Sequence, residues 1–306
     1  MEKIIRKYLL DIFLENSSLL ATYMGEPAVF NTKVPDDVNE EYEEEESYWK
    51  DDIQYPRCVF ELSMQADTER SVSGRLLIDV MAENNEFQQH EPLASILKDA
   101  VDGCFFSNTD LTISAQWDRS DVFAEDDDKV VGITLSFDIL AYPNQQTQSP
   151  DPIVAMNTWL KTLYQKAYVI GLDTLPEVWK PTNDSPALYC RLAKLGNSSR
   201  MNSTACVTWI GADIYMNVMT PDESTRSTLC MTIHSMLNHA SRIILDDDSP
   251  MLIDNVTTNL TSDPLRDGQL YIKTTYGVLP QSIQKPRLNR ATIHGLHVES
   301  EVQHGK

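Results

Sequence analysis

The sequence predicts an α+β fold made of two related domains, each a small mixed or antiparallel sheet packed by amphipathic helices. Three observations predict it: alternating polarity marks strands, helical spacing of apolar residues marks the segments between them, and one order of elements occurs twice. A chain of 306 residues also has room for two domains of ordinary size. We place the first domain at 1–146 with an acidic insertion at 36–52, a divergent second copy at 147–280, and a flexible C-terminal tail or arm at 281–306.

The clearest part of the first repeat is residues 74–142. A strand at 75–81 is followed by an amphipathic helix, a short strand at 111–114, and a closing strand at 131–141 in which polar and apolar residues alternate. This order gives a small sheet with one helix on its inner face. The residues expected in its core are Leu97, Val101, Leu135 and Phe137.

The second half repeats the same order of elements. A strand at 212–219 precedes a helix with apolar spacing over 229–244, and strands follow at 252–256 and 269–279. Asn217-Val218-Met219 occupies the place of Asp79-Val80-Met81 in the first repeat. Identity between the halves is low, so the repeat rests on order and spacing. The residues expected in this core are Ile233, Leu237 and Ile272.

Each half also opens with an amphipathic helix and a strand entered through a proline. Asp151 and Pro152 mark the start of the second opening helix, because Asp is a favoured N-cap and Pro fits the first helical position. The proline-led strands are expected at 55–62 and 186–192. The repeat therefore extends over both whole halves.

The charge of the chain is strongly acidic, with a formal net charge of −21. This argues against tight wrapping of a phosphate backbone, although an acidic wall can serve nucleic acid by repelling it. Segment 36–52 holds ten acidic residues and one lysine, which favours a solvated loop or spacer. Tyr42, Tyr48 and Trp49 are the only hint of a docking role there.

No catalytic, cofactor-binding or metal site is expected, because the sequence has no phosphate-binding glycine loop, zinc-protease motif or hydrolase nucleophile elbow. Five cysteines without a CxxC pair fit a reducing compartment, and no secretory or membrane-spanning segment is expected. A metal-dependent phosphodiesterase that uses Asp79, Asp121 and Asp126 to Asp128 remains an alternative. It lacks a nearby histidine and a cationic phosphate clamp.

The pattern resembles the tail-terminator, or tail-completion, proteins of long-tailed bacteriophages. The resemblance rests on the opening helix, the strand Tyr55-Pro56-Arg57-Cys58-Val59-Phe60, the strand Arg75-Leu76-Leu77-Ile78-Asp79-Val80, an aspartate-rich stretch, and Phe137-Asp138 in the closing strand. It covers residues 1–143 along their length. The second half resembles the family more weakly, because Asn217 replaces the Asp and Lys273-Thr274 occupies the region of Phe137-Asp138.

The resemblance implies a structural virion protein and no enzyme. Such a protein forms a ring that caps the tail tube, stops its polymerisation and joins the tail to the head or neck, after assembly in the host cytoplasm. Its partners would be itself, as a homo-hexamer or a trimer of two-domain chains, the tail tube protein and the head-completion or neck connector protein. DNA would pass through the lumen without specific binding, and no membrane would be involved.

Two other interpretations stay open. One is a different head-to-tail connector of the neck, and the other is an acidic adaptor that binds a basic partner through 36–52. For the ring, the stretch from Trp117 to Asp128 is expected to be a long acidic loop between two strands. The residues expected to make ring or lumen contacts are Trp117, Arg119, Asp121, Glu125, Asp126, Asp127 and Asp128.

Deletion of Glu43 to Glu46 tests the interpretation of the acidic segment. Carboxylates at this density cannot be buried without a large desolvation cost, so they should carry no core packing. The melting temperature of the variant, measured by circular dichroism, should change by less than about 2 °C. A decrease of many degrees would show that these residues carry structure.

Overall fold

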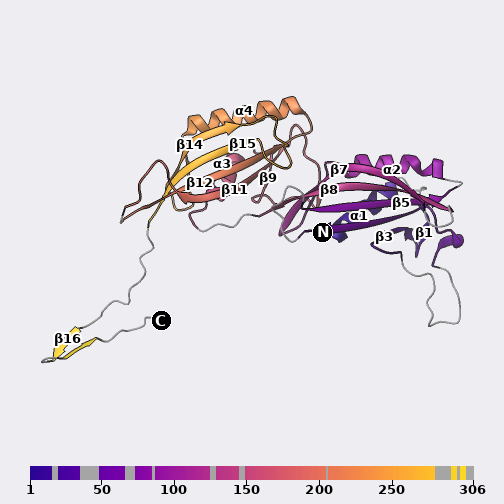
Figure 1. The fold of residues 1–306 in the computed structure, drawn as a ribbon, viewed down its shortest axis with the longest axis horizontal. Coiled ribbons are helices and arrows are strands. Elements are labelled where there is room, and N and C mark those ends of the chain that lie inside the picture. Colours follow the sequence, from indigo (N-terminus) through magenta and orange to yellow (C-terminus); the bar gives the residue numbers. More distant parts are fainter. Residues whose placement is uncertain are drawn as a thin grey trace.

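The computed structural model describes residues 1–15, 20–34, 48–65, 73–84, 87–124, 129–144, 149–204, 206–279, 291–294 and 297–300. These residues form an α+β protein with two mixed sheets that lie side by side, each covered by helices (Figure 1). Much of segment 36–52, the linker at 145–148 and most of the predicted tail lie outside the described residues. No helix in the described ranges combines the length and apolar character needed to cross a membrane.

The first sheet has the strand order β10-β6-β7-β8-β5-β4-β3. Neighbouring strands are antiparallel, except that β3 and β4 run parallel. Its elements are α1 (Glu2–Glu15), β3 (Val29–Asn31), β4 (Arg57–Met64), β5 (Gly74–Glu83), α2 (Phe87–Val101), β6 (Phe105–Ser107), β7 (Leu111–Ala124) and β8 (Val130–Pro143), with β10 (Val178–Trp179) supplied by the second half.

The second sheet has the strand order β13-β14-β15-β12-β11-β9. Its neighbours are also antiparallel, except for the parallel pair β9 and β11 at one edge. Its elements are α3 (Pro152–Leu163), β9 (Tyr168–Ile170), β11 (Ala187–Asn197), β12 (Thr208–Met219), α4 (Glu223–Ala240), β13 (Arg242–Ile244), β14 (Pro250–Thr258) and β15 (Leu270–Val278).

The two halves therefore share one topology. Strands β3 to β8 of the first half correspond in order and direction to β9, β11, β12, β13, β14 and β15 of the second. Helices α1 and α2 correspond in the same way to α3 and α4. The repeated order of elements predicted from the sequence is confirmed. Strand β10 has no counterpart among the described residues of the first half, and it pairs with a strand outside its own half.

Each sheet buries one face under its two helices. In β5, alternate residues Leu76, Ile78 and Val80 join the apolar faces of α1 and α2 in one cluster. The corresponding cluster of the second half contains residues of α3, α4 and the inner face of β12. All seven residues expected in the two cores are buried, with Leu97, Phe137, Ile233, Leu237 and Ile272 fully inaccessible.

Local signals explain where two helices begin and end. The Asp151 carboxylate accepts hydrogen bonds from the backbone N–H groups of Ile153 and Val154, so the predicted N-cap of α3 is confirmed. Helix α4 ends at Ala240, because Ser241 adopts a left-handed conformation with φ of 59°. The prediction that the helix continues to Ile244 is therefore wrong, since Ile244 lies in β13.

The end of the acidic segment is part of the fold. Trp49 is only 3% exposed and packs edge-to-face against Phe30 and Tyr23, near the short strands β1 (Thr22–Tyr23) and β2 (Glu26–Pro27). A short 3-10 turn, η1 (Lys50–Asp52), follows it. Trp49 therefore does not support the hint of a docking role, because its ring fills a small aromatic cluster.

The C-terminal region also contains regular structure that the sequence did not predict. Strands β16 (Ala291–His294) and β17 (His297–Ser300) pair as a hairpin that stands away from both sheets (Figure 1).

Replacement of Leu97 tests the packing of α2. Leu97→Ala removes a fully buried side chain, and it should lower the free energy of unfolding by about 2–5 kcal/mol. Leu14→Ala on α1 is the matched control, because Leu14 is 59% exposed, and it should cost less than about 0.5 kcal/mol. Urea unfolding measures both. Equal losses in the two variants would contradict the assigned helix face.

Candidate functional site

The expected contact residues belong to a strand. Trp117, Arg119 and Asp121 lie within β7, which runs to Ala124 in place of ending near residue 114. The prediction of a long loop from Trp117 is therefore wrong. The reason is that β8 presents a partner along the whole of β7, and the backbone ladder forms whatever the side chains are. Glu125, Asp126, Asp127 and Asp128 lie outside the described residues.

The second part of β7 forms an open sheet edge. On the side away from β8, β6 pairs only with residues 112–114 of β7, and the last backbone bonds there join Ala115 to Gly103 and Cys104. Within the described chain, residues 119–124 therefore pair on one side only, and Asp118 is the bulged residue before them. We call residues 118–124 the open edge of β7. Val122 on this edge is 69% exposed.

A β-bulge at Asp118 divides the side chains of β7 between the two faces. Trp117 lies on the helix side, where the Lys98 ammonium stands 3.6 Å from its ring centroid and the Asp102 carboxylate accepts its backbone N–H. Arg119 lies on the opposite face and donates to the carboxylate of Asp121 at 2.8 Å. Hydrogen bonding and charge from Asp121 raise the pKa of Arg119 above its ordinary value.

The face of the first sheet away from its helices carries a row of polar residues. In register, Asp79 on β5, Thr134 on β8 and Asp121 on β7 are direct neighbours. The Thr134 hydroxyl donates to Asp79, whose pKa burial raises above its usual value. Farther along, the half-buried ring of Phe123 lies over Gly132, where an added Cβ would come within 2.3 Å of it.

This row bears on the phosphodiesterase alternative. The sheet brings Asp79 and Asp121 to one face, while Asp126 to Asp128 fall outside the described residues. Within the described ranges, no group of three or more His, Cys, Asp or Glu residues is placed to hold a metal ion. The Asp246 to Asp248 triplet lies in a turn, in which the Asp247 carboxylate accepts the backbone N–H of Ser249.

The junction between the halves is a second built site. Strand β10 pairs with β6, so Trp179 from the second half stacks on Phe105 with ring centroids 4.6 Å apart. The Trp179 indole N–H donates to the Ser107 hydroxyl at 3.0 Å. The buried cluster around them draws on the outer faces of both sheets, and its remaining members are Leu140, Tyr142, Ile170, Ala187, Tyr189 and Met219.

Two cations reinforce this junction. The Lys180 ammonium donates to the carbonyl oxygens of Asp99 and Asp102 at the C-terminal end of α2, which satisfies acceptors that the helix leaves free. Arg266, in the loop between β14 and β15, reaches the outer face of the first sheet and pairs with Asp138 at 2.9 Å. The second half thus contacts the first through an added strand and a charged loop.

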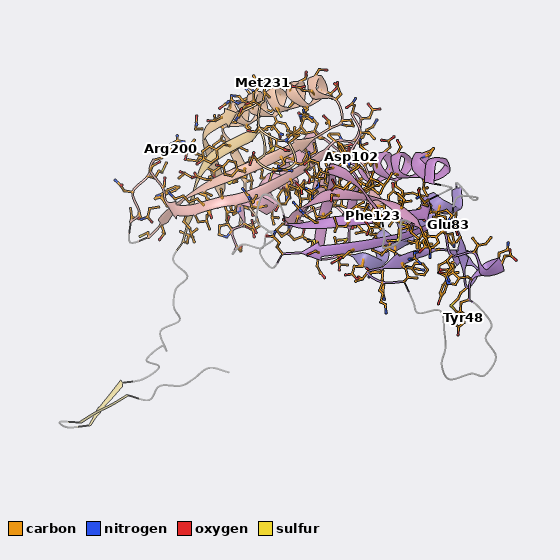
Figure 2. The ribbon with its side chains drawn as sticks, turned by 45° about the vertical axis from the view of Figure 1, so that its right-hand side comes forward. Tyr48, Glu83, Asp102, Phe123, Arg200 and Met231 are labelled. Atoms are coloured by element: carbon orange, nitrogen blue, oxygen red, sulfur yellow. The ribbon has the colours of Figure 1, made fainter. Side chains whose placement is uncertain are left out.

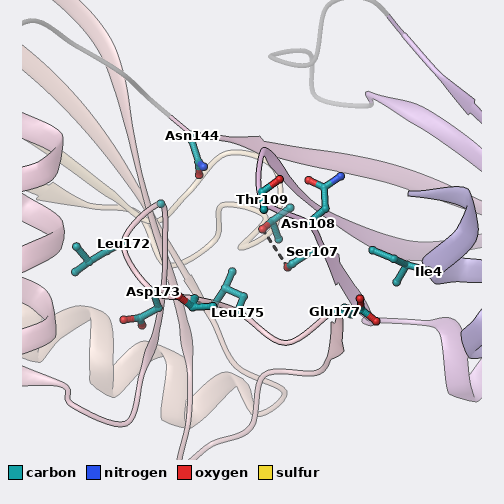
Figure 3. A pocket seen from close by; sticks show the side chains of 12 residues that line it. Ile4, Ser107, Asn108, Thr109, Asn144, Leu172, Asp173, Leu175 and Glu177 are labelled. Atoms are coloured by element: carbon teal, nitrogen blue, oxygen red, sulfur yellow. Dashed lines mark hydrogen bonds between the residues drawn. The ribbon is translucent and has the colours of Figure 1, made fainter.

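A pocket of about 550 Å³ lies beside this junction (Figure 3). Side chains from both halves surround it, with Ser107 and Asn108 on one side and Leu172 and Leu175 on the other. Sequence reasoning missed both the pocket and the junction, because a two-residue strand such as β10 leaves no periodicity to detect.

Comparison of the chain with protein-family models, with curated proteins and with solved structures finds no match.

Removal of the Trp179 side chain should weaken the junction. Trp179→Ala should lower the free energy of unfolding by about 3–5 kcal/mol, because it deletes a buried ring stacked between the halves. Trp179→Phe keeps one aromatic ring but loses the bond to Ser107 and part of the buried ring volume, so it should cost less than the alanine variant. Guanidinium unfolding measures both. A loss in the alanine variant below that of the phenylalanine variant would refute the assigned role.

The raised pKa of Asp79 predicts a pH-dependent effect on stability. Burial favours the protonated carboxyl in the folded state, so this contribution to stability is full below the unfolded pKa of about 3.9 and is lost as pH rises through the folded pKa. Asp79→Asn should therefore raise the melting temperature at pH 7, and the gain should shrink on acidification. Asp110→Asn at an exposed turn is the control, and it should change neither the melting temperature at pH 7 nor its dependence on pH. A gain that is independent of pH would exclude titration of Asp79 as its cause.

Proposed function

We propose that this chain is a structural component of a bacteriophage tail, a terminator that assembles into a ring, caps the tail tube and joins it to the head or neck. The observation that carries the proposal is the duplication of one sheet topology, with an open strand edge at the same place in each copy. In the first copy this is residues 118–124 of β7. In the second it is residues 254–258 of β14, since β13 covers only the start of that strand.

A duplicated unit of this kind suits a ring. A ring needs a head-to-tail interface that closes, and each chain offers two similar surfaces in a fixed relation to one another. The built junction supports this relation, because Trp179, Lys180 and Arg266 join the halves by stacking, capping and an ion pair. A loose linkage would let the angle between units vary and would favour open chains over closed rings.

The charge of the chain supports a passage for DNA. A net charge of −21 gives a lumen wall that repels the phosphate backbone, so DNA passes without sticking. Exposed carboxylates on the outer face of the first sheet, such as Asp121, contribute to such a wall. The partners in this proposal are further copies of the chain, the tail tube protein and a connector protein of the neck.

The assembled mass tests the proposal. We expect a closed ring of six chains, with a mass of about 208 kDa, six times the 34.7 kDa of one chain. Three two-domain chains, at about 104 kDa, are the alternative, in which six similar units would close the ring. Light scattering after size exclusion measures the mass, and negative-stain images show whether a central channel is present.

A functional assay complements the mass. Purified protein added to polymerising tail tubes should stop their elongation, and labelled protein should mark the head-proximal end of the tail. Label at the neck without any effect on tube length would favour a different head-to-tail connector. A strictly monomeric protein, both free and in purified virions, would refute the ring.

A further inference from the structure

The C-terminal hairpin lacks a third strand in the described chain. Strands β16 and β17 pair with each other over four residue pairs and with no strand of either larger sheet among the described residues. An isolated two-stranded hairpin is marginally stable in water, and it gains stability when it joins a larger sheet. The hairpin therefore has a free strand edge to offer, at a distance from the body of its own chain (Figure 1).

The open edge of β7 is a suitable acceptor. Beyond the bulge at Asp118, residues 119–124 run in regular pairing with β8, and this stretch is longer than either four-residue strand of the hairpin. An open edge presents unpaired N–H and C=O groups, and an added strand satisfies them. Val122 and Trp117, which are 69% and 37% exposed, stand on the helix side of this edge, where an added strand would shield them.

Charge favours this hairpin as the strand that adds to the open edge of β7. The segment that leads to it, 281–290, contains Lys285, Arg287 and Arg290 and no acidic residue, in a chain whose net charge is −21. Asp118 and Asp121 lie on the open edge of β7 and share one cation, Arg119, so two negative charges and one positive charge leave this edge with a net negative charge. A basic arm is thus attracted to this edge, whereas the acidic bodies of two copies repel each other.

The other open edge fits less well. On β14 only residues 254–258 are open, and the Asp254 carboxylate is already bound by the Arg200 guanidinium and the Thr275 hydroxyl. Arg200 balances the charge of Asp254, whereas on the edge of β7 the single cation Arg119 faces two carboxylates. Figure 2 shows Arg200 at the far end of the second half and Phe123, on the open edge of β7, in the first.

The chain length between sheet and hairpin permits contact with a neighbour. Twelve residues, 279–290, connect the end of β15 to β16. A fully extended chain of this length reaches roughly 40 Å, which exceeds the diameter of about 30 Å typical of a small domain.

We propose that the β16–β17 hairpin of one copy adds to the open edge of β7 in a neighbouring copy, so that a continuous sheet crosses between two chains. This inference rests on the proposed ring and names the contact that links its members. The occupant is a second copy of this chain, held by backbone hydrogen bonds and by attraction between the basic arm and the acidic edge.

Hydrogen exchange tests the pairing in the full-length protein. Amides of residues 119–124 should exchange at least tenfold more slowly in the assembled full chain than in a chain that ends at residue 279. That shorter chain should stay folded, because it keeps every residue that the two described cores contain. Addition of a synthetic peptide of residues 280–306 to the shorter chain should restore slow exchange at the same amides.

A charge reversal supplies the matched variants. Asp121→Lys in the shorter chain should weaken binding of the peptide at least tenfold, measured by fluorescence anisotropy. Asp184→Lys, at an exposed position in the second half, should leave binding unchanged. Equal effects of the two variants on peptide binding would overturn the electrostatic attraction between the basic arm and the open edge of β7. Slowed exchange at 254–258 in place of 119–124 would overturn the choice of β7.

The outcomes separate this inference from the proposed function. A ring of full mass whose 119–124 amides exchange freely would overturn the hairpin pairing and leave the ring standing. A two-chain species with slowed exchange at this edge would support the pairing and overturn the ring. Slow exchange at the same amides in a monomer would place the hairpin on its own chain, which overturns pairing between copies.

Discussion

The pairing of β10 with β6, sealed by Trp179 on Phe105, is the constraint on which the rest of the structure depends. Strand β6 has three residues and would otherwise be a weak sheet edge. The same contact covers Leu140 and Tyr142, apolar residues on the face of the first sheet that its helices do not reach. Because this contact joins the outer faces of both sheets, it fixes one repeat against the other and decides which surfaces stay open.

One difference between the repeats contributes to this junction. Asp79 in the first copy accepts a hydrogen bond from Thr134, whereas Asn217 takes its place in the second copy and donates its amide N–H to the Pro264 carbonyl. A carboxylate cannot donate that bond. Asn217 thereby anchors the loop that presents Arg266 to Asp138 on the other sheet. The two copies share one topology but differ in their outer faces. The second half supplies the loop with Arg266, and the first half supplies Asp138, to which it binds.

At the junction, β10 covers the edge of β6, whereas β7 stays open beyond the end of its pairing with β6. Charge and a bulge at Asp118 guard the open edge against unspecific pairing, as is usual for exposed edges. A guarded edge still accepts a strand of complementary charge, and the acidic body of this chain favours a basic one. The proposed ring and the proposed hairpin contact both follow from this division between a sealed edge and an open one.

The sequence by itself determined the parts of the fold that depend on local periodicity. Alternation placed β5 and β8, helical spacing placed Leu97 and Leu237 in the cores, and the recurrence of both patterns identified the repeat. Only the tertiary structure decided that β7 extends through the polar stretch after residue 114 and that β10 joins the first sheet. Both depend on backbone hydrogen bonds to a neighbouring strand, β8 for the first and β6 for the second, and these bonds are indifferent to side-chain pattern. The candidate surfaces lie at these same places, so the sequence could name Trp117, Arg119 and Asp121 but could not assign them to a sheet edge.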